Sequence, residues 1–441
     1  MRTWIRRGSL AACFAAGTIG PVTSDPAAAQ PPPAEEQAIV GAVDAHAAEA
    51  LALLERLVDV NSGTMNFAGV REVGRLLQTE LDGLGFATRW VDGSGFGRAG
   101  HLVAERPGAG PRVLLIGHLD TVFEPDSPFQ RFELLPGDRA RGPGIIDMKG
   151  GDVIMVLALR ALRDAGLLDR LRLTVVLTGD EEETGEPLAL ARAELVAAGS
   201  RADVAIGFED GDGRFENAVV ARRGSTGWRL RATGKSAHSS LVFRDDVGHG
   251  AIYELARILD GFRRELAGEE YLTFHPRVVV GGTAVEFDPE QLRGTASGKT
   301  NIIAATAVVA GDLRTISPDQ LERTRQRMRD IVARHLPQAG AEIVFDDGYP
   351  PMAPTPGNRR LLALYDEVSR DLGFGPVGPV DPNQAGAADV SFVAAKVDMA
   401  LDALGLKGTG GHTVEETADL TTLPRQAKRA AVLLYRLSRG D

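Results

Sequence analysis

The hydrophobic pattern of the chain alternates between helical and extended segments. Apolar residues recur at helical spacing over residues 42–58 and 69–84, and residues 150–166 are apolar almost all round, which predicts a buried helix. Short apolar runs that predict strands lie at residues 87–91, 101–106, 112–118, 171–180 and 201–210. This alternation predicts an α/β fold with a sheet that helices cover on both faces.

The pattern changes after about Arg222. Residues 227–234 alternate between apolar and polar with a period of two, which is typical of a strand with one solvated face. The segments that follow predict a ferredoxin-like β-α-β-β-α-β order. They are a helix at 250–262, strands at 277–287 and 300–315, a helix at 317–336 that Ser317 and Pro318 begin, and a strand at 341–348. The first pattern resumes at about Pro350, so we expect an inserted domain.

Composition narrows the classes of protein. The chain has 441 residues, which favours two domains, and 44% of them are hydrophobic, as in a globular protein. A formal charge of −11 argues against a nucleic-acid partner, which requires a basic surface. Cys13 is the single cysteine of the sequence, so the chain has neither an internal disulfide nor a thiolate metal cluster.

The N-terminus has the layout of a signal peptide over residues 1–29. Arg2, Arg6 and Arg7 precede an apolar stretch at 10–22, and three alanines at 27–29 offer a cleavage site. We therefore expect a periplasmic or secreted protein, by a general secretory, twin-arginine or lipoprotein signal. Residues 30–37 are expected to form a flexible lead-in. No later apolar run approaches the ~18–20 residues of a membrane span, so none is expected.

Five short motifs that carry histidines or carboxylates follow predicted strands or stand in glycine-rich loops. The motifs are "GHLD" (117–120), "RGPGIIDMKGG" (141–151), "TGDEEETG" (178–185), "GFED" (207–210) and "GTGGHT" (408–413). Loops at the carboxyl ends of strands are where ligands bind in such sheets. A mixture of nitrogen and oxygen donors without thiolates suits zinc, and less often manganese or cobalt.

Each motif alone also fits a structural role. Asp147 fits a helix N-cap, the acidic run 180–183 fits a solvated loop, and His118 or His412 fits an ordinary structural or turn histidine. The acidic run, however, follows a strand too apolar for the surface, where a buried cation would offset its charge. Asp120 is the type of group that holds a ligating imidazole by its second nitrogen. Together the five motifs favour a metal site.

In this order and spacing, the motifs resemble those of the dinuclear zinc exopeptidases and amidohydrolases, a family that includes bacterial glutamate carboxypeptidases, aminoacylases and succinyl-diaminopimelate desuccinylase. The resemblance extends from about Ala38 to the C-terminus. It implies a zinc-exopeptidase-like mixed sheet between helices, formed by residues 38–221 and 350–441. It also implies that residues 222–349 form a lid and dimerisation domain, through which a homodimer would assemble.

The resemblance implies two Zn²⁺ ions per subunit, with Co²⁺ or Mn²⁺ as alternatives. Asp147 would bridge the two ions. The implied ligands of one ion are His118 and Glu209, and those of the other are Glu182 and His412. Asp120 would orient His118, and Glu181 would be the general base. Because the acidic run has an extra member, Glu182 and Glu183 are an alternative pair of base and ligand, but the strand register favours Glu181 and Glu182.

Three lid residues match substrate-binding positions of the family. His238, in "GKSAHSS", matches a histidine that supports the oxyanion, often in the partner's active site. Asn301 and Arg314 match residues that bind a substrate carboxylate, for which a planar guanidinium is suited. A surface histidine and an ordinary arginine ion pair are the structural alternatives for His238 and Arg314.

The sequence therefore predicts a zinc-dependent hydrolase that cleaves an amide or peptide bond of short peptides or N-acyl amino acids with a free carboxylate. A dedicated N-acyl-amino-acid deacylase and a non-catalytic binding protein that keeps the fold are the alternatives. Neither a phosphate-binding GxxxxGK[ST] loop nor a GxSxG serine elbow occurs in the sequence, which argues against phosphotransferases and serine hydrolases.

Overall fold

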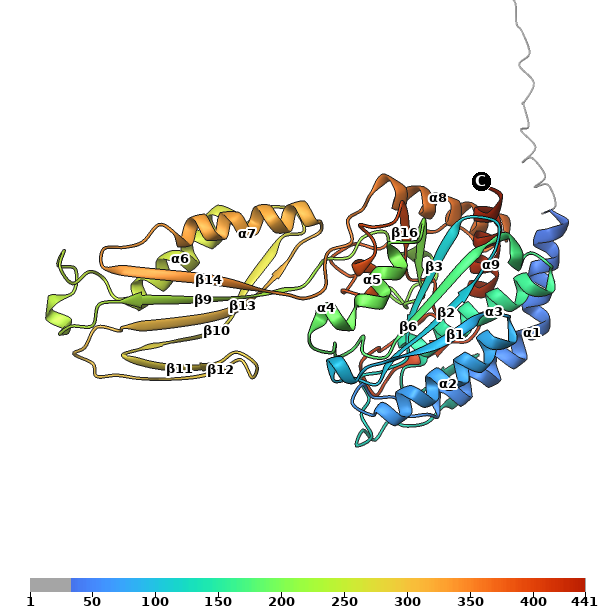
Figure 1. Ribbon diagram of the computed structural model, residues 1–441, viewed down its shortest axis with the longest axis horizontal. Coiled ribbons are helices and arrows are strands. Elements are labelled where there is room, and N and C mark those ends of the chain that lie inside the picture. The colour runs from blue at the N-terminus through green and yellow to red at the C-terminus, as the bar shows by residue number, and fades with distance from the viewer. Residues whose placement is uncertain (1–32, 441) are drawn as a thin grey trace, which may run out of the picture. The chain divides into compact units, whose positions relative to one another are not determined.

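A computed structural model describes residues 33–440 of the chain (Figure 1). The predicted signal peptide, residues 1–29, lies outside the described residues.

A six-stranded mixed sheet forms the centre of the part of the structure outside residues 222–349, in the order β1-β2-β6-β3-β7-β16. Strands β6, β3, β7 and β16 run parallel to one another, whereas β1 and β2 form an antiparallel edge. The strands are β1 (Ala87–Asp92), β2 (Gly100–Arg106), β3 (Arg112–His118), β6 (Arg172–Thr178), β7 (Val204–Gly207) and β16 (Met399–Leu401). This arrangement confirms the predicted α/β class.

Both faces of this sheet are buried. Side chains of alternate residues point to opposite faces of a strand, so a strand between two apolar layers contributes to both. In β3, Val113 and Leu115 join one apolar cluster, and Leu114 and Ile116 join another. The first cluster includes side chains of five helices, and the second includes those of α5 (Ala193–Gly199) and the segment 389–394. The five helices are α1 (Ala34–Val58), α2 (Phe67–Gly83), α3 (Gly150–Asp164), α8 (Pro356–Asp371) and α9 (Thr422–Arg439).

Helix α1 begins at Ala34, so the predicted flexible lead-in was wrong for residues 34–37. Glu36 explains the difference, because its buried carboxylate accepts two hydrogen bonds from Arg436 at 2.9 and 3.1 Å, which fixes the first turn. By length and composition α1 also passes as a membrane-spanning helix, so the expectation of no such segment is not confirmed. Its apolar face packs on α3 and α9, as that of a core helix does.

A second sheet has the antiparallel order β10-β13-β9-β14. Its four strands and two helices follow one another as β-α-β-β-α-β, and α6 and α7 lie on the same face of the sheet (Figure 1). This is the ferredoxin-like arrangement. The elements are β9 (Thr226–Gly234), α6 (Ala251–Leu266), β10 (Thr273–Gly282), β13 (Thr306–Arg314), α7 (Pro318–Val332) and β14 (Ala339–Asp347).

The structure also contains elements that differ from the predictions. The predicted strand at 277–287 is divided, because the chain leaves β10 at Gly282 and forms a hairpin of β11 (Ala284–Asp288) and β12 (Arg293–Ser297). The predicted strand at 300–315 begins only at Thr306.

The shorter elements are β4 (Glu133–Leu135), β5 (Arg139–Arg141), α4 (Leu188–Ala191), β8 (Asn217–Ala218), β15 (Gly378–Pro379), β17 (Gly408–Thr409) and β18 (Thr417–Asp419).

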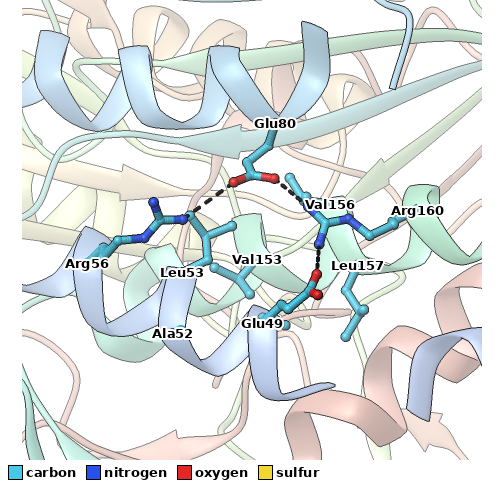
Figure 2. A pocket seen from close by; sticks show the side chains of 10 residues that line it. Glu49, Ala52, Leu53, Arg56, Glu80, Val153, Val156, Leu157 and Arg160 are labelled. Carbon is cyan, nitrogen blue, oxygen red and sulfur yellow. Dashed lines mark hydrogen bonds and ion pairs between the residues drawn. The ribbon is translucent and has the colours of Figure 1, made fainter. Parts of the chain in front are cut away.

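A cavity of about 290 Å³ lies between α1, α2 and α3 (Figure 2). Its charged side chains are paired with one another, since Arg160 contacts both Glu49 and Glu80, and Arg56 contacts Glu80. None of the predicted site residues lines this cavity. We therefore assign it to the packing of the three helices.

Candidate metal centre

The fold brings the ends of three parallel strands to one edge of the central sheet. His118 is the last residue of β3, Glu181 and Glu182 follow the end of β6 at Thr178, and Glu209 follows the end of β7 at Gly207. Because β3 pairs in parallel with both β6 and β7, these residues lie side by side. The topology therefore gathers donors that are far apart in the sequence.

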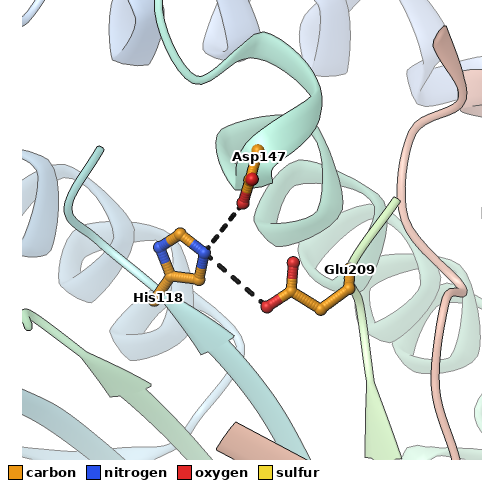
Figure 3. Close-up of side chains that lie close together, drawn as sticks. All are labelled: His118, Asp147 and Glu209. Atoms are coloured by element: carbon orange, nitrogen blue, oxygen red, sulfur yellow. Dashed lines mark hydrogen bonds and ion pairs between the residues drawn. The ribbon is translucent and has the colours of Figure 1, made fainter. Parts of the chain in front are cut away.

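Asp147 connects two groups of potential metal ligands. In the first group, His118 Nε2 lies 3.1 Å from Asp147 Oδ1 and 3.6 Å from Glu209 Oε1 (Figure 3). In the second group, His412 Nε2 lies 2.9 Å from Asp147 Oδ2 and 3.1 Å from Glu182 Oε2. Asp147 thus offers one carboxylate oxygen to each group, as a residue shared by two ions would.

The donors present fit a cation. Glu182 Oε1 is buried and has no hydrogen-bond partner among the described residues. Burial raises the pKa of Glu182 and that of Glu209, and the charge of Asp147 raises both further. The neighbouring histidines offset the charge of each carboxylate only in part, and a divalent ion would supply further compensation. Nitrogen and oxygen donors without sulfur suit zinc, manganese or cobalt.

The neighbouring carboxylates raise the pKa of both histidines and so favour their protonated forms. Burial acts to lower the pKa of His118, but the charge of Glu209 and the carboxylates of Asp120 and Asp147 raise it well above 6.5. Hydrogen bonds with Asp147 and Glu182 raise the pKa of His412 to about 11. Binding of a metal by either imidazole nitrogen therefore displaces a proton.

Asp120 fixes His118 in a different way from the one expected. His118 Nδ1 donates a hydrogen bond of 3.0 Å to the main-chain oxygen of Asp120, whereas the nearest carboxylate oxygen is 3.5 Å away. This bond leaves Nε2 free to face the metal ligands. The Asp120 carboxylate instead accepts from the main-chain nitrogens of Glu181 and Glu182, at 3.0 and 3.1 Å, and from Thr64 Oγ1 at 2.7 Å. Asp120 therefore positions the acidic loop as well as the imidazole.

Glu181 and Glu183 have opposite surroundings. Burial, together with the charges of Asp389, Glu182 and Asp147, raises the pKa of Glu181 well above 4.5, and its carboxyl has no hydrogen-bond partner among the described residues. Glu183 is 65% exposed and pairs with Arg98 at 2.9 Å. The geometry therefore favours Glu181 and Glu182, rather than Glu182 and Glu183, as base and ligand.

The prediction from sequence missed Glu416, which holds the loop that carries Asp147. Its buried carboxylate accepts hydrogen bonds from the main-chain nitrogens of Gly144 (3.0 Å), Ile146 (2.8 Å) and Asp147 (3.3 Å). The Asp147–Met148 peptide bond in this loop is cis. The "HTVEET" segment shows two acids, but no local pattern indicates that one of them lies 272 residues from its partner.

The three predicted substrate-binding residues lie in the inserted domain. His238 and Asn301 are neighbours, since Ser239 N donates to Asn301 O at 2.8 Å, and His238 Nδ1 contacts Ser240 Oγ at 2.8 Å. Arg314 lies at the other end of β13 and donates to Asp312 Oδ2 at 2.8 Å. The structure therefore does not bring Arg314 together with His238 and Asn301 within one chain.

Comparisons with known proteins identify the family of the chain. A profile of Peptidase family M20/M25/M40 matches residues 114–436. Carboxypeptidase G2 of Pseudomonas sp. strain RS-16 is 25% identical over 399 residues, which cover 88% of this chain and 89% of that protein. Succinyl-diaminopimelate desuccinylase of Gluconobacter oxydans is 27% identical over 368 residues, which cover 79% of this chain and 87% of that protein.

Solved structures share the fold at low sequence identity. Aminopeptidase PepT of Bacillus cereus has a TM-score of 0.67 at 16% identity, with 89% of this chain and 98% of that chain covered. The YXEP protein of Bacillus subtilis, described as a dinuclear metal binding peptidase of the M20 family, has a TM-score of 0.62 at 16% identity, with coverage of 90% and 99%. The chain belongs to peptidase family M20/M25/M40 and is a hydrolase of the peptidase and amidohydrolase class.

Proposed function

We propose that the protein is a zinc-dependent hydrolase that cleaves an amide or peptide bond of short peptides or N-acyl amino acids with a free carboxylate. The observation that carries the proposal is the pair of donor groups that share Asp147, with the unpaired carboxyl of Glu181 beside them. His118 and Glu209 would hold one ion, and Glu182 and His412 the other.

Each part of the site has a role in this chemistry. Two bound ions would lower the pKa of a water toward ~7 and polarise the substrate carbonyl. Glu181 would accept the proton of the attacking water and pass it to the leaving nitrogen, as a general base and then acid. Burial suits Glu181 for both steps, because a raised pKa brings the carboxyl closer to the working pH.

The proposal is tested with a panel of N-acyl amino acids and dipeptides, each with and without added zinc, cobalt or manganese. We expect hydrolysis that requires added or retained metal. Glu181→Gln should keep both ions and lose at least about 10²-fold in kcat, the lower range of general acid–base catalysis. Glu183→Gln, in the adjacent exposed position, is the control and should behave as wild type. Near-normal turnover of Glu181→Gln would remove this residue from the role of base.

The same panel separates the two candidate activities. Carboxypeptidase G2 and succinyl-diaminopimelate desuccinylase are both relatives of similar identity, so the comparison alone favours neither a peptidase nor a deacylase. A preference for dipeptides over the matched N-acyl amino acids supports the peptidase. The reverse preference supports a dedicated deacylase.

For substrate binding we propose His238, Asn301 and Arg314. Arg314 is 37% exposed, and its one ion pair among the described residues is with Asp312, so its guanidinium keeps donors for a second carboxylate. Arg314→Ala should raise KM for substrates with a free carboxylate, by about 10-fold or more if a charge-assisted bond is lost, with less effect on their amides. Steady-state kinetics on a carboxylate substrate and its amide measures the difference. If Arg314→Ala and wild type have the same KM for the carboxylate substrate, Arg314 has a structural role only.

We also propose an exported protein that forms a homodimer through the inserted domain. The order of arginines, apolar residues and alanines over residues 1–29 supports export. N-terminal sequencing of the protein from the periplasm or medium should begin at Gln30, and size-exclusion chromatography with light scattering reports the oligomeric state. An N-terminus at Met1 or a monomer would contradict the respective proposal.

A further inference from the structure

Two chain segments connect the inserted domain to the part of the structure that carries the proposed metal site, which we call the catalytic half. We call these segments, residues 222–225 and 349–352, the connector. The two segments are hydrogen-bonded to each other, since Arg222 and Met352 exchange two main-chain bonds of 3.0 Å. Ser225 N also donates to the main-chain oxygen of Tyr349 at 2.8 Å. The connector is therefore a paired ribbon rather than two independent loops.

One strand of the connector contacts the loop that carries the proposed base. Tyr349 Oη donates a hydrogen bond of 2.8 Å to the main-chain oxygen of Glu181. The same hydroxyl accepts a bond of 3.0 Å from Arg192 Nη2, so its proton is directed to Glu181. The ring of Tyr349 packs at 59° against that of Phe392, with centroids 4.9 Å apart.

Arg192 is a rigid support for this tyrosine. It is 1% exposed, and its guanidinium donates to the Asp180 carboxylate at 2.6 Å and to the Asp180 main-chain oxygen at 3.0 Å. Its Nε lies 2.8 Å from Asp389 Oδ1. Asp180 immediately precedes Glu181. Arg192 therefore holds the residue before Glu181, and Tyr349 holds the main-chain oxygen of Glu181 itself.

The other strand of the connector is linked to a predicted metal-ligand loop through Asp402. Arg222 Nε donates to Asp402 Oδ2 at 2.9 Å, and Asp402 Oδ1 accepts from the main-chain nitrogen of Glu209 at 3.3 Å. Arg222 is 4% exposed. Tyr349 thus contacts a loop of the site directly, whereas Arg222 is linked to another loop through Asp402.

We propose that Tyr349 is a positioning residue, which holds the backbone of Glu181 so that its carboxyl stays within reach of the attacking water. The inference rests on the proposed role of Glu181 as general base. Tyr349 itself does not touch the reacting atoms. A general base acts only within hydrogen-bond reach of the proton it takes, and a misplacement of about 1 Å costs up to about 10²-fold in rate.

The test is Tyr349→Phe, which removes the hydroxyl and keeps the ring against Phe392 and Arg192. We expect kcat to fall about 10-fold, with KM and metal content within twofold of wild type. Tyr365→Phe is the matched control, since it removes a buried hydroxyl that bonds Gln426 Oε1 at 2.9 Å in the catalytic half.

The outcomes are distinguishable. A Tyr349→Phe variant with wild-type kcat, whatever its melting temperature, would overturn the inference and leave the proposed function intact. A loss of kcat of the same size in Tyr365→Phe would show that any lost buried hydroxyl has this effect, which also overturns it. A wild-type enzyme without activity on the whole panel, metals added, would overturn the proposed function and this inference with it.

Discussion

At the scale of single residues, carboxylates have two roles in the site: some are potential metal ligands and others hold the loops in place. Asp147 is shared by two donor groups, while Asp120 and Glu416 bind main-chain nitrogens of neighbouring loops. A carboxylate that accepts several main-chain hydrogen bonds fixes a loop without occupying space in the site. The residues that ligate and the residues that position are therefore of the same chemical type, and only their surroundings separate them.

Glu416→Gln tests the positioning role of the acid that sequence analysis missed. The amide has a single acceptor oxygen, so at least one of the bonds to Gly144 N and Ile146 N is lost and Asp147 is held less firmly. Metal affinity should fall about 10- to 100-fold, as for other groups that orient ligands. Zinc titration against a competing chelator measures this change.

Glu415→Gln is the control for that experiment, because Glu415 is its exposed neighbour. Equal zinc affinities of Glu416→Gln and wild type would show that the Asp147 loop holds its shape without this carboxylate.

The proposed ligands were predictable from the sequence because each stands in a distinct motif after an apolar strand or in a glycine-rich loop. Glu416 and Asp402 were not, because an isolated acid has no local pattern, and their partners come from other parts of the chain. The type of bond between His118 and Asp120 was also beyond prediction, because a two-residue spacing does not distinguish the main-chain oxygen from the carboxylate.

At the scale of elements, long apolar runs were predicted most accurately. Strand β3 was predicted with its observed ends because the apolar run 113–117 lies between Arg112 and His118. The β11–β12 hairpin was not predicted, since its residues are mostly polar or exposed and pair only with each other. Helix α8 was not predicted, because a proline-rich segment precedes it. Its start does have a helical signal, since Thr355 caps it and Pro356 is its first residue.

Glu254, on α6, should make the stability of the inserted domain depend on pH. Burial acts to raise its pKa, but hydrogen bonds from Arg257 and from Leu336 N outweigh this effect and hold the pKa below 4.5. A depressed folded-state pKa adds stability above pH 4.5 that is lost as pH falls through the folded value. Glu254→Gln should cost about 1.5–3 kcal/mol at pH 7 and less in acid.

Calorimetry of Glu254→Gln at pH 7 and pH 4 measures that difference. Glu322→Gln is the control, since the Glu322 side chain is 65% exposed and pairs with Arg325. If the difference in unfolding free energy between Glu254→Gln and wild type is the same at both pH values, the assigned role of the carboxylate is wrong.

At the scale of the whole molecule, metal binding should stabilise the fold. Removal of ions leaves the buried carboxylates of Glu182 and Glu209 without the proposed compensation. An ion present at 100 times its Kd adds about 2.7 kcal/mol per site. Chelation should therefore lower the Tm by several degrees, and zinc should restore it. An unchanged Tm in protein shown by elemental analysis to be metal-free would exclude this coupling.

The insertion of residues 226–347 between Glu209 and His412 also sets the time at which the site is completed during synthesis. A ribosome makes the chain from its N-terminus, so the first group of donors exists long before the second. A nascent chain, or one truncated before His412, thus lacks the imidazole of the second group, and hydrolytic activity should arise only after His412 has been made.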